Sequence, residues 1–232
     1  MRHKKSKLIC FTGIDGSGKT TLARALVAGL ETKGFGTRYV YGRLQPIILW
    51  PVFLVGRVLF LHRKDMYRDY VGYSQAKKGL LENRVLSAVY EGLVLFDYFF
   101  QVTMKIRLPL AIGRDIVCDR YVYDTVITDL AVDLNYPQWR IDKALRRYLW
   151  LFPKPDLVFL IDVPEGIANQ RKDDVPSVKY LEERRKLYLQ VGRENGMTIL
   201  DGSKGLDELK TAVQSEAIRH LRGDAGGDPA KE

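Results

Sequence analysis

The feature that most constrains this chain is a glycine-rich run, Gly13–Thr20, placed between a strand-like and a helix-like stretch. The run fills every fixed position of the phosphate-loop pattern G-x-x-x-x-G-K-[ST], after the apolar Leu8–Phe11 and before the helical pattern Thr21–Leu26. Glycine backbones can curl around an anion without a Cβ clash, and the helix N-terminus adds partial positive charge at the same point. The run therefore predicts a nucleoside triphosphate site rather than a glycine-rich turn that binds nothing.

The positions of this loop have different expected roles. We expect Lys19 to bridge the β- and γ-phosphates and the Thr20 hydroxyl to bind Mg²⁺. The predicted nucleotide-binding residues are Gly13, Asp15, Gly16, Ser17, Gly18, Lys19, Thr20 and Thr21.

Length and composition are those of one globular domain. The chain has 232 residues, of which 46% are hydrophobic, enough for a single core over residues 1–222, while residues 223–232 are small and polar and predict a disordered tail. Cys10 and Cys118 both lie in apolar runs without metal-ligand spacing, so we expect buried thiols in a reducing compartment. The apolar run after the basic N-terminus is short and leads into the phosphate loop, so that cleavage by a signal peptidase would destroy the site. We therefore expect a cytoplasmic location.

The formal net charge of +9 raises the question of nucleic-acid binding. Basic residues are spread along the chain, without zinc-finger spacing, an RNA-recognition signature or a dense basic block beyond the first seven residues. A protein that handles several phosphates needs excess positive charge in any case. We therefore expect a small-molecule partner and no nucleic acid.

Strand-like and helical patterns alternate along the chain, which predicts a doubly wound α/β sheet of parallel strands with its site at their carboxyl ends. Two of the predicted strands are continuous apolar runs that end in Asp, as expected for central strands covered on both faces. The predicted strands are Leu8–Thr12, Thr37–Tyr41, Asp115–Asp119, Leu157–Asp162 and Thr198–Leu200.

One apolar segment, Ile47–Leu61, is too short to span a bilayer, which takes about 20 residues, and Pro51 and Arg57 interrupt it. Aromatic residues gather again between Tyr90 and Phe100. Helix packing or a homodimer face explains this excess, and a peripheral contact with a membrane or a lipid substrate is the alternative.

The motif after the third predicted strand separates classes of phosphate-loop proteins. The chain has no Asn-Lys-x-Asp run, which a GTPase uses to bind guanine, and Asp119-Arg120-Tyr121 stands where a motor or transporter ATPase usually has Asp-Glu. This arrangement favours a small-molecule kinase.

Three motifs together resemble the thymidylate kinase family in order and spacing. They are the phosphate loop with its flanks, Phe11–Leu22, the Asp119-Arg120-Tyr121 run, and Pro155–Glu165, and the resemblance extends from about Lys7 to Leu221. It implies a five-stranded parallel sheet, ATP with Mg²⁺ as donor, and a lid near 170–177. It also implies an acceptor site built from the region of Asp119-Arg120-Tyr121 and the loop after the second strand, with Asp15 directed toward the acceptor's sugar.

Phosphoryl transfer depends on cations around the γ-phosphate, and this assigns further roles. Lys19 and Arg120 are the expected fixed cations, although Arg120 could instead form only a structural ion pair. Arg171 and Lys172 would close over the nucleotide as a lid, and the alternative is that this run is only a solvated loop. Asp119 would bind Mg²⁺ through its hydration shell or accept a proton from the acceptor. The predicted catalytic residues are Lys19, Asp119, Arg120 and Arg171, with Thr20 and Asp119 at the metal.

Departures from the family concern the acceptor. Where thymidylate kinases commonly have Arg-Glu-Pro-Gly-Gly, this chain has Arg43-Leu44-Gln45-Pro46, and Asp124 stands where the family tends to have Ser. A carboxylate there repels a phosphate but suits hydrogen bonds to sugar hydroxyls or activation of an alcohol. The predicted acceptor-binding residues are Asp15, Arg43, Arg120, Tyr121 and Asp124.

Three functions remain compatible with these residues. The leading hypothesis is phosphoryl transfer from Mg·ATP to a nucleoside monophosphate, dTMP to dTDP above others. The second is a kinase of the same fold that phosphorylates a hydroxyl of a sugar or a lipid-linked precursor. The third is a nucleotide-dependent binding module without turnover.

Overall fold

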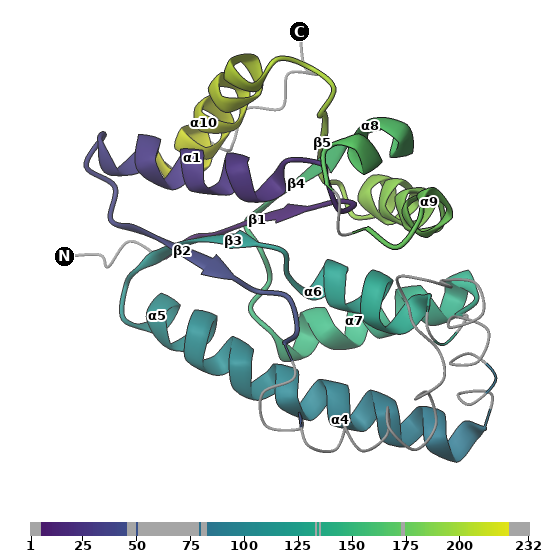
Figure 1. Ribbon diagram of the computed structural model, residues 1–232. Coiled ribbons are helices and arrows are strands. Elements are labelled where there is room, and N and C mark those ends of the chain that lie inside the picture. Colours follow the sequence, from purple (N-terminus) through teal and green to yellow (C-terminus); the bar gives the residue numbers. More distant parts are fainter. Residues whose placement is uncertain are drawn as a thin grey trace, which may run out of the picture.

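The five strands form one parallel sheet in the order β2-β3-β1-β4-β5 (Figure 1). The computed structural model describes residues 6–45, 50, 79, 83–132, 134, 136–172 and 175–222. This sheet confirms the predicted α/β class, and four strands have the predicted bounds while the fifth is one residue longer, because Asp201 still pairs with Asp162. The strands are β1 (Leu8–Thr12), β2 (Thr37–Tyr41), β3 (Asp115–Asp119), β4 (Leu157–Asp162) and β5 (Thr198–Asp201).

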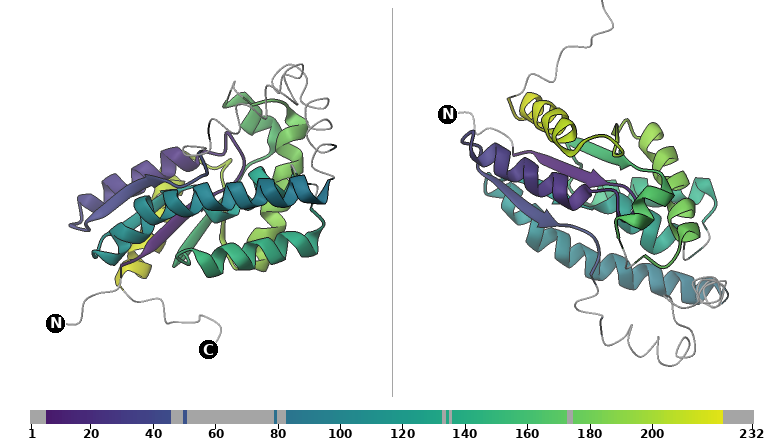
Figure 2. Two further views of the ribbon diagram at one scale, coloured as in Figure 1. Left: turned by 90° about the horizontal axis from the view of Figure 1, so that it is seen from below. Right: turned by 45° about the horizontal axis from the view of Figure 1, so that its top comes forward.

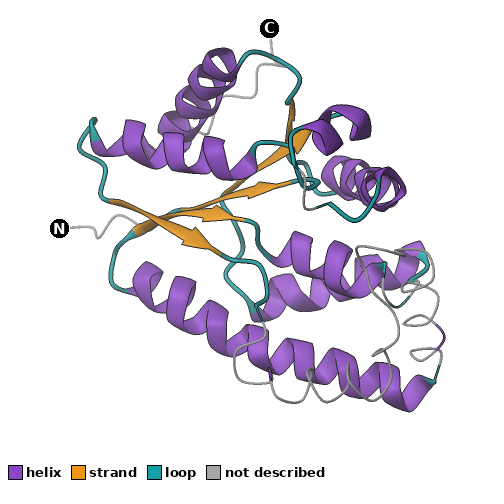
Figure 3. Cartoon of the chain, viewed as in Figure 1, coloured by secondary structure: helices purple, strands orange, loops and turns teal. Residues whose placement is uncertain are grey.

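The central strand β1 pairs with β3 on one side and β4 on the other, so that Cys10 lies beside Cys118 and Val158. All five residues of β1 are buried, which explains its uninterrupted apolar sequence. All strand arrows in Figure 3 point toward the same edge of the sheet. The phosphate loop after β1 and the motif after β3 therefore leave the sheet at neighbouring points on this edge.

Helices cover both faces of the sheet. α1 and α10 lie on one face, α4, α5 and α7 on the other, and α8 and α9 stand near the carboxyl edge (Figures 1 and 2). The helical elements are α1 (Lys19–Glu31), α4 (Arg84–Val102), α5 (Leu108–Ala111), α6 (Val122–Asp124), α7 (Gln138–Leu151), α8 (Glu165–Gln170), α9 (Val178–Glu194), α10 (Leu206–Arg222) and the π-helical segments η1 (Thr103–Arg107) and η2 (Thr125–Ala131).

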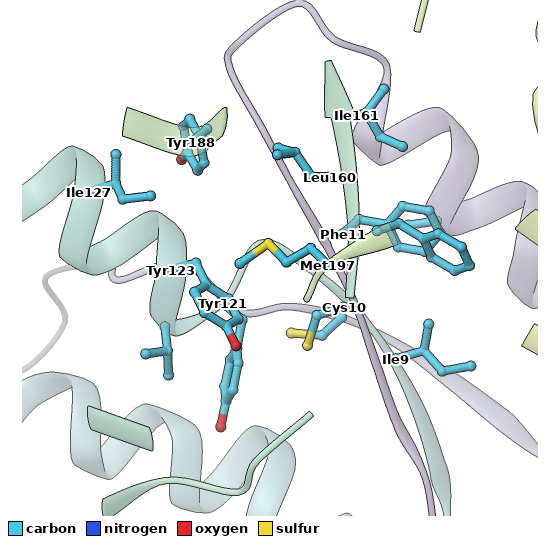
Figure 4. Close-up of a cluster of buried hydrophobic side chains, with 14 of the residues drawn as sticks. Ile9, Cys10, Phe11, Tyr121, Tyr123, Ile127, Leu160, Ile161, Tyr188 and Met197 are labelled. Carbon is cyan, nitrogen blue, oxygen red and sulfur yellow. The ribbon is translucent and has the colours of Figure 1, made fainter. Parts of the chain in front are cut away.

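The core fills the space on both sides of β1. Figure 4 shows Cys10 pointing toward Tyr121, while Ile9 and Phe11 point the other way, as the alternation of strand side chains requires. The Phe11 ring packs against that of Phe159, with centroids 5.1 Å apart. Cys10 and Cys118 are both free and buried, as predicted, and burial raises the pKa of the Cys10 thiol.

The long helix that begins with α4 carries an exposed apolar surface. Between Arg84 and Ala111 it is long and apolar enough to cross a membrane by length and composition, but this test is weak evidence, because core helices of soluble proteins also pass it. Exposed apolar side chains on this helix are Val85, Leu86, Val89, Phe96, Phe99, Phe100, Met104 and Leu108. The predicted apolar segment 47–61 lies outside the described residues except for Trp50, as do the tail 223–232 and residues 1–5.

Candidate active site

The phosphate loop has a backbone that only glycine adopts readily at three positions. Gly13, Gly16 and Gly18 have φ angles of 134°, 80° and 92°. A Cβ on Gly13 would lie 2.5 Å from the Ile161 carbonyl oxygen, and one on Gly16 would lie 2.2 Å from that of Ala168. The loop is thus wedged between the end of β4 and α8. Gly18 begins α1 without a side-chain cap, which leaves the helix N-terminus to an anion.

Lys19 is buried beneath this loop. Its ammonium donates to the Ile14 carbonyl and to Ser17 Oγ, the latter at 3.3 Å. Burial, reinforced by the nearby positive charge of Arg120, lowers the pKa of Lys19 to about 7, although three carboxylates oppose this shift. A bound polyphosphate would supply the negative charge that this buried ammonium needs.

A hydroxyl and a carboxylate form the predicted metal position. Thr20 Oγ1 donates to Asp119 Oδ2 at 2.6 Å, and the Tyr39 hydroxyl donates to the same oxygen at 2.8 Å. Asp119 Oδ1 is buried and has no hydrogen-bond partner in the part of the chain that the structure describes. Mg²⁺ typically takes one or two carboxylates and completes its shell with water and phosphate oxygens, so this donor set fits a magnesium ion that arrives with a nucleotide.

A metal position made of one hydroxyl and one carboxylate differs from a site built from several metal-binding side chains. The described residues contain no group of three or more His, Cys, Asp or Glu side chains that could hold a metal ion. A hydroxyl, a single carboxylate and the phosphates of a ligand require no such group.

Arg120 follows β3 in the left-handed region, with φ of 65°, the only non-glycine residue there among those described. Its guanidinium donates to Asp15 and lies 3.8 Å from Asp124, and the whole side chain is largely buried. Lys172 Nζ, from the lid, is 3.7 Å from the same Asp15. Burial alone would raise the pKa of Asp15, but Arg120 and Lys19 outweigh it and hold that pKa well below its usual range.

Asp124 lies deeper than its predicted role requires. It has no exposed surface, and its Oδ2 accepts hydrogen bonds from Thr12 Oγ1 at 2.9 Å and from the Tyr121 backbone N–H at 3.1 Å. Oδ1 accepts from the Tyr188 hydroxyl at 2.8 Å. Burial raises the pKa of Asp124, and Arg120 opposes that shift. In this conformation Asp124 faces the Arg120 guanidinium at 3.8 Å, and its direct contact with an acceptor stays a prediction.

Tyr121, like Asp124, lies in the interior of the protein. It is fully buried among the core side chains (Figure 4), and its hydroxyl donates to the Pro153 carbonyl at 3.0 Å. The Arg120 guanidinium faces Asp15, while the side chain of the next residue, Tyr121, is buried in the core. The contact of Tyr121 with an acceptor therefore stays a prediction, and in this conformation its hydroxyl is bonded to the Pro153 carbonyl.

Arg43, after β2, is held by a carboxylate that was not predicted. Its Nη2 lies 2.7 Å from Asp129 Oδ1, and its Nε lies 3.4 Å from Oδ2. Asp129 raises the pKa of Arg43, and burial opposes this shift. The position of Arg43 is fixed by Gly42, where a Cβ would lie 2.6 Å from the Arg120 carbonyl oxygen. In this structure Arg43, the predicted ligand of the acceptor phosphate, is therefore paired with Asp129.

The two predicted lid cations, Arg171 and Lys172, have partners in different parts of the molecule. Arg171 donates to the Gly202 carbonyl at 3.0 Å, beyond β5, while Lys172 reaches Asp15. Ser177 caps α9 as predicted, accepting from the Tyr180 N–H at 3.1 Å. Asp173 and Asp174 lie outside the described residues, so the lid boundaries remain a prediction.

Three tyrosines of the site were missed from the sequence. Tyr39 contacts Asp119, Tyr180 donates to Asp15 Oδ2 at 3.4 Å, and Tyr188 contacts Asp124. The last two come from α9 and are eight residues apart, which is about two helical turns. Their spacing places both tyrosines on one face of the helix, which was the available sequence signal. A helix face that only packs against the core has the same spacing, so the signal was not specific.

Comparison with known proteins gives several relatives of similar length. The chain is 27% identical over 209 residues to a probable thymidylate kinase of Sulfurisphaera tokodaii, covering 88% of this chain and 91% of that protein. It is 28% identical over 212 residues to probable thymidylate kinase 1 of Saccharolobus solfataricus, covering 88% and 92%. A thymidylate kinase of Leptospira borgpetersenii is 27% identical over 223 residues, covering 90% and 92%.

No protein-family model matches the chain. The three alignments nevertheless cover at least 88% of this chain and at least 91% of each relative. With a five-stranded parallel sheet and a complete phosphate loop, the chain has the architecture of a phosphate-loop kinase and is similar over most of its length to thymidylate kinases.

Proposed function

We propose that this protein transfers the γ-phosphoryl group of Mg·ATP to a nucleoside monophosphate, with dTMP as the favoured acceptor and dTDP as product. One observation carries the proposal: cations from three separate elements surround Asp15, namely Lys19 of the phosphate loop, Arg120 after β3 and Lys172 of the lid. Phosphoryl transfer spreads negative charge over the equatorial oxygens of the moving group, and catalysis depends on such positioned cations.

Each group of the donor side has a proposed task. The loop backbone and Lys19 bind the β- and γ-phosphates, and Thr20 with Asp119 holds the magnesium ion. That ion, when bound, neutralises charge on the phosphate oxygens. Thr21 hydrogen-bonds the nucleotide from the first turn of α1, where its side chain is exposed.

On the acceptor side, Arg120 bridges donor and acceptor phosphates while Asp15 fixes its guanidinium and contacts the acceptor's sugar. Arg43 binds the acceptor phosphate after exchanging Asp129 for it. Arg171, which follows α8 and donates to the Gly202 carbonyl, supports the donor nucleotide, and Lys172 closes over the transferred group. ATP as donor and dTMP as acceptor rest on the similarity to named thymidylate kinases.

The Arg43–Asp129 ion pair favours a second candidate, a hydroxyl acceptor such as a sugar. A paired arginine attracts a phosphate less than a free one, and a carboxylate such as Asp129 hydrogen-bonds hydroxyls well. Asp124 is not the base for this reaction in the present conformation, because its oxygens are buried and already bonded.

The deciding experiment measures ATP consumption with Mg²⁺ against nucleoside monophosphates, nucleosides and sugars. Lys19→Ala serves as the inactive protein, and Lys186→Ala, an exposed lysine paired only with Glu182, serves as the matched control. Turnover that depends on dTMP, lost in the first variant and kept in the second, supports the proposal. Turnover with sugars alone would replace it by the second candidate, and nucleotide binding without any turnover would leave a binding module.

A further inference from the structure

Arg120 is held between two carboxylates, and each of these is also held by a tyrosine of α9. Asp15 accepts from the Tyr180 hydroxyl, and Asp124 accepts from the Tyr188 hydroxyl. The helix that follows the lid thus contacts both acidic partners of the cation that we place between donor and acceptor. No sequence motif marked this arrangement.

The Asp124 half of this cluster is closed to ligands. Asp124 is completely buried, and three donors from three elements satisfy it: Thr12 of β1, the Tyr121 N–H at the start of α6, and Tyr188 of α9. Tyr188 is itself buried and shares a hydrogen bond of 3.1 Å with Thr128 Oγ1. A carboxylate enclosed in this way acts through the group it faces, which is the Arg120 guanidinium.

Arg120 needs such support for two reasons. Its backbone lies in the left-handed region, which costs a non-glycine residue about 1 kcal/mol or more. Its Nε is buried without a hydrogen-bond partner among the described residues, so the side chain depends on the two carboxylates at its far end. Removing the Asp124 carboxylate would leave Asp15 as the remaining acidic partner of the guanidinium.

We propose that Asp124, held by Tyr188, is a positioning residue that fixes the Arg120 guanidinium toward the acceptor. This inference rests on the proposed function for the role of Arg120 in transfer. Asp124 contacts no substrate in this account, and its charge is not consumed or titrated in the reaction. Because Tyr188 lies on α9, its hydrogen bond to Asp124 also couples the position of α9, the helix that follows the lid, to that of Arg120.

A kinetic double-mutant cycle tests this proposal with dTMP as acceptor. Asp124→Asn keeps the shape of the side chain and removes its charge, and Arg120→Lys keeps a cation that cannot reach both carboxylates. We expect Asp124→Asn to lower kcat/KM for the acceptor about tenfold or more in the wild-type background but less than about threefold beside Arg120→Lys, with the KM for ATP unchanged. Equal losses in both backgrounds would overturn the proposal, because a merely structural residue acts independently of Arg120.

Tyr188→Phe and Tyr148→Phe form a matched pair of buried substitutions. The Tyr188 hydroxyl supports Asp124, whereas the Tyr148 hydroxyl is buried without a partner in the described part of the chain. We expect the first to raise the acceptor KM or lower kcat and the second to change neither. A loss of the same size in Tyr148→Phe would assign the effect to general core packing and contradict the proposal.

A stability cycle separates this inference from the proposed function, because it needs no substrate. Arg120→Ala leaves Asp124 buried without its cation and should lower the melting temperature, and adding Asp124→Asn should restore part of it. Recovery in a protein that does not turn over dTMP would overturn the proposed acceptor and retain the coupling. Additive losses would overturn the coupling even if dTMP is the acceptor.

Discussion

The proposed donor side and the proposed acceptor side of the site are built by different means. The donor side is one contiguous run, Gly13–Thr20, whose backbone conformation is set by three glycines. The acceptor side consists of ion pairs between residues far apart in sequence: Arg43 and Asp129 are separated by 86 positions, and Asp15 and Arg120 by 105. The donor side therefore tolerates few local changes, whereas the acceptor side can be altered one pair at a time.

The largest expected effect tests the donor side. Lys19→Ala removes the only cation that the structure places inside the phosphate loop, and we expect turnover to fall by about 10³-fold, a size typical for loss of one transition-state donor. The fold should persist, because the wild-type protein gains little from burying this charge. Steady-state rates and circular dichroism measure the two outcomes; turnover within tenfold of wild type would contradict the assigned role.

A second change tests whether the donor side really depends on backbone shape. Gly16→Ala places a methyl group 2.2 Å from the Ala168 carbonyl oxygen at a φ of 80°, so we expect about 2 kcal/mol of lost stability and no measurable nucleotide binding. Gly36→Ala is the control, because its Cβ meets nothing within 4 Å and its φ is not positive. Chemical denaturation and nucleotide titration measure both variants, and equal behaviour would show that loop shape is not limiting.

On the acceptor side, two substitutions break the same ion pair from opposite ends. Arg43→Gln should raise the KM of a phosphate-bearing acceptor about tenfold without changing the KM for ATP. Asp129→Asn frees Arg43, so we expect the same KM to fall a few-fold. If the acceptor binds through hydroxyls instead, Asp129→Asn will weaken it, and steady-state kinetics of the two variants will show the opposite order.

The smallest expected effect is a pH dependence of stability. Since the pKa of Asp15 is lowered in the folded state, the unfolded chain binds this proton more readily as pH falls through the ordinary aspartate pKa of 3.8. The stabilisation from the Asp15–Arg120 pair is therefore present above that pH and is lost progressively below it. Asp15→Asn should flatten this part of the stability curve, and urea denaturation between about pH 3 and 6 compares the two proteins. An unchanged slope would mean that Asp15 is not held by Arg120 in solution.

The predictable part of the molecule is the part encoded by neighbouring residues. Apolar runs that end at Asp or at a turn predicted the observed bounds of four of the five strands. The phosphate loop matched a single contiguous sequence pattern. The helix after the lid began where Ser177 predicted it, because an N-cap acts on the next three residues.

The acceptor side was only partly predictable, since its contacts depend on the assembled fold. Asp129 and Tyr188 show no special spacing in sequence, and each acquires a role only when η2, α9 and β2 come together. The Tyr121 hydroxyl bonds the Pro153 carbonyl, 32 positions away, and no local pattern predicts that partner. Asp124 was expected to be accessible, but three donors enclose it.

The left-handed Arg120 also has a consequence for the order of folding. Arg120 is held in this conformation by Asp15, 105 positions away in sequence, and by the nearby Asp124, which Thr12 in turn holds from 112 positions away. Contacts of long sequence separation generally form late, after local elements have assembled. We therefore expect a refolding chain to regain nucleotide binding first and phosphoryl transfer last, so that catalytic competence reports the final step of folding.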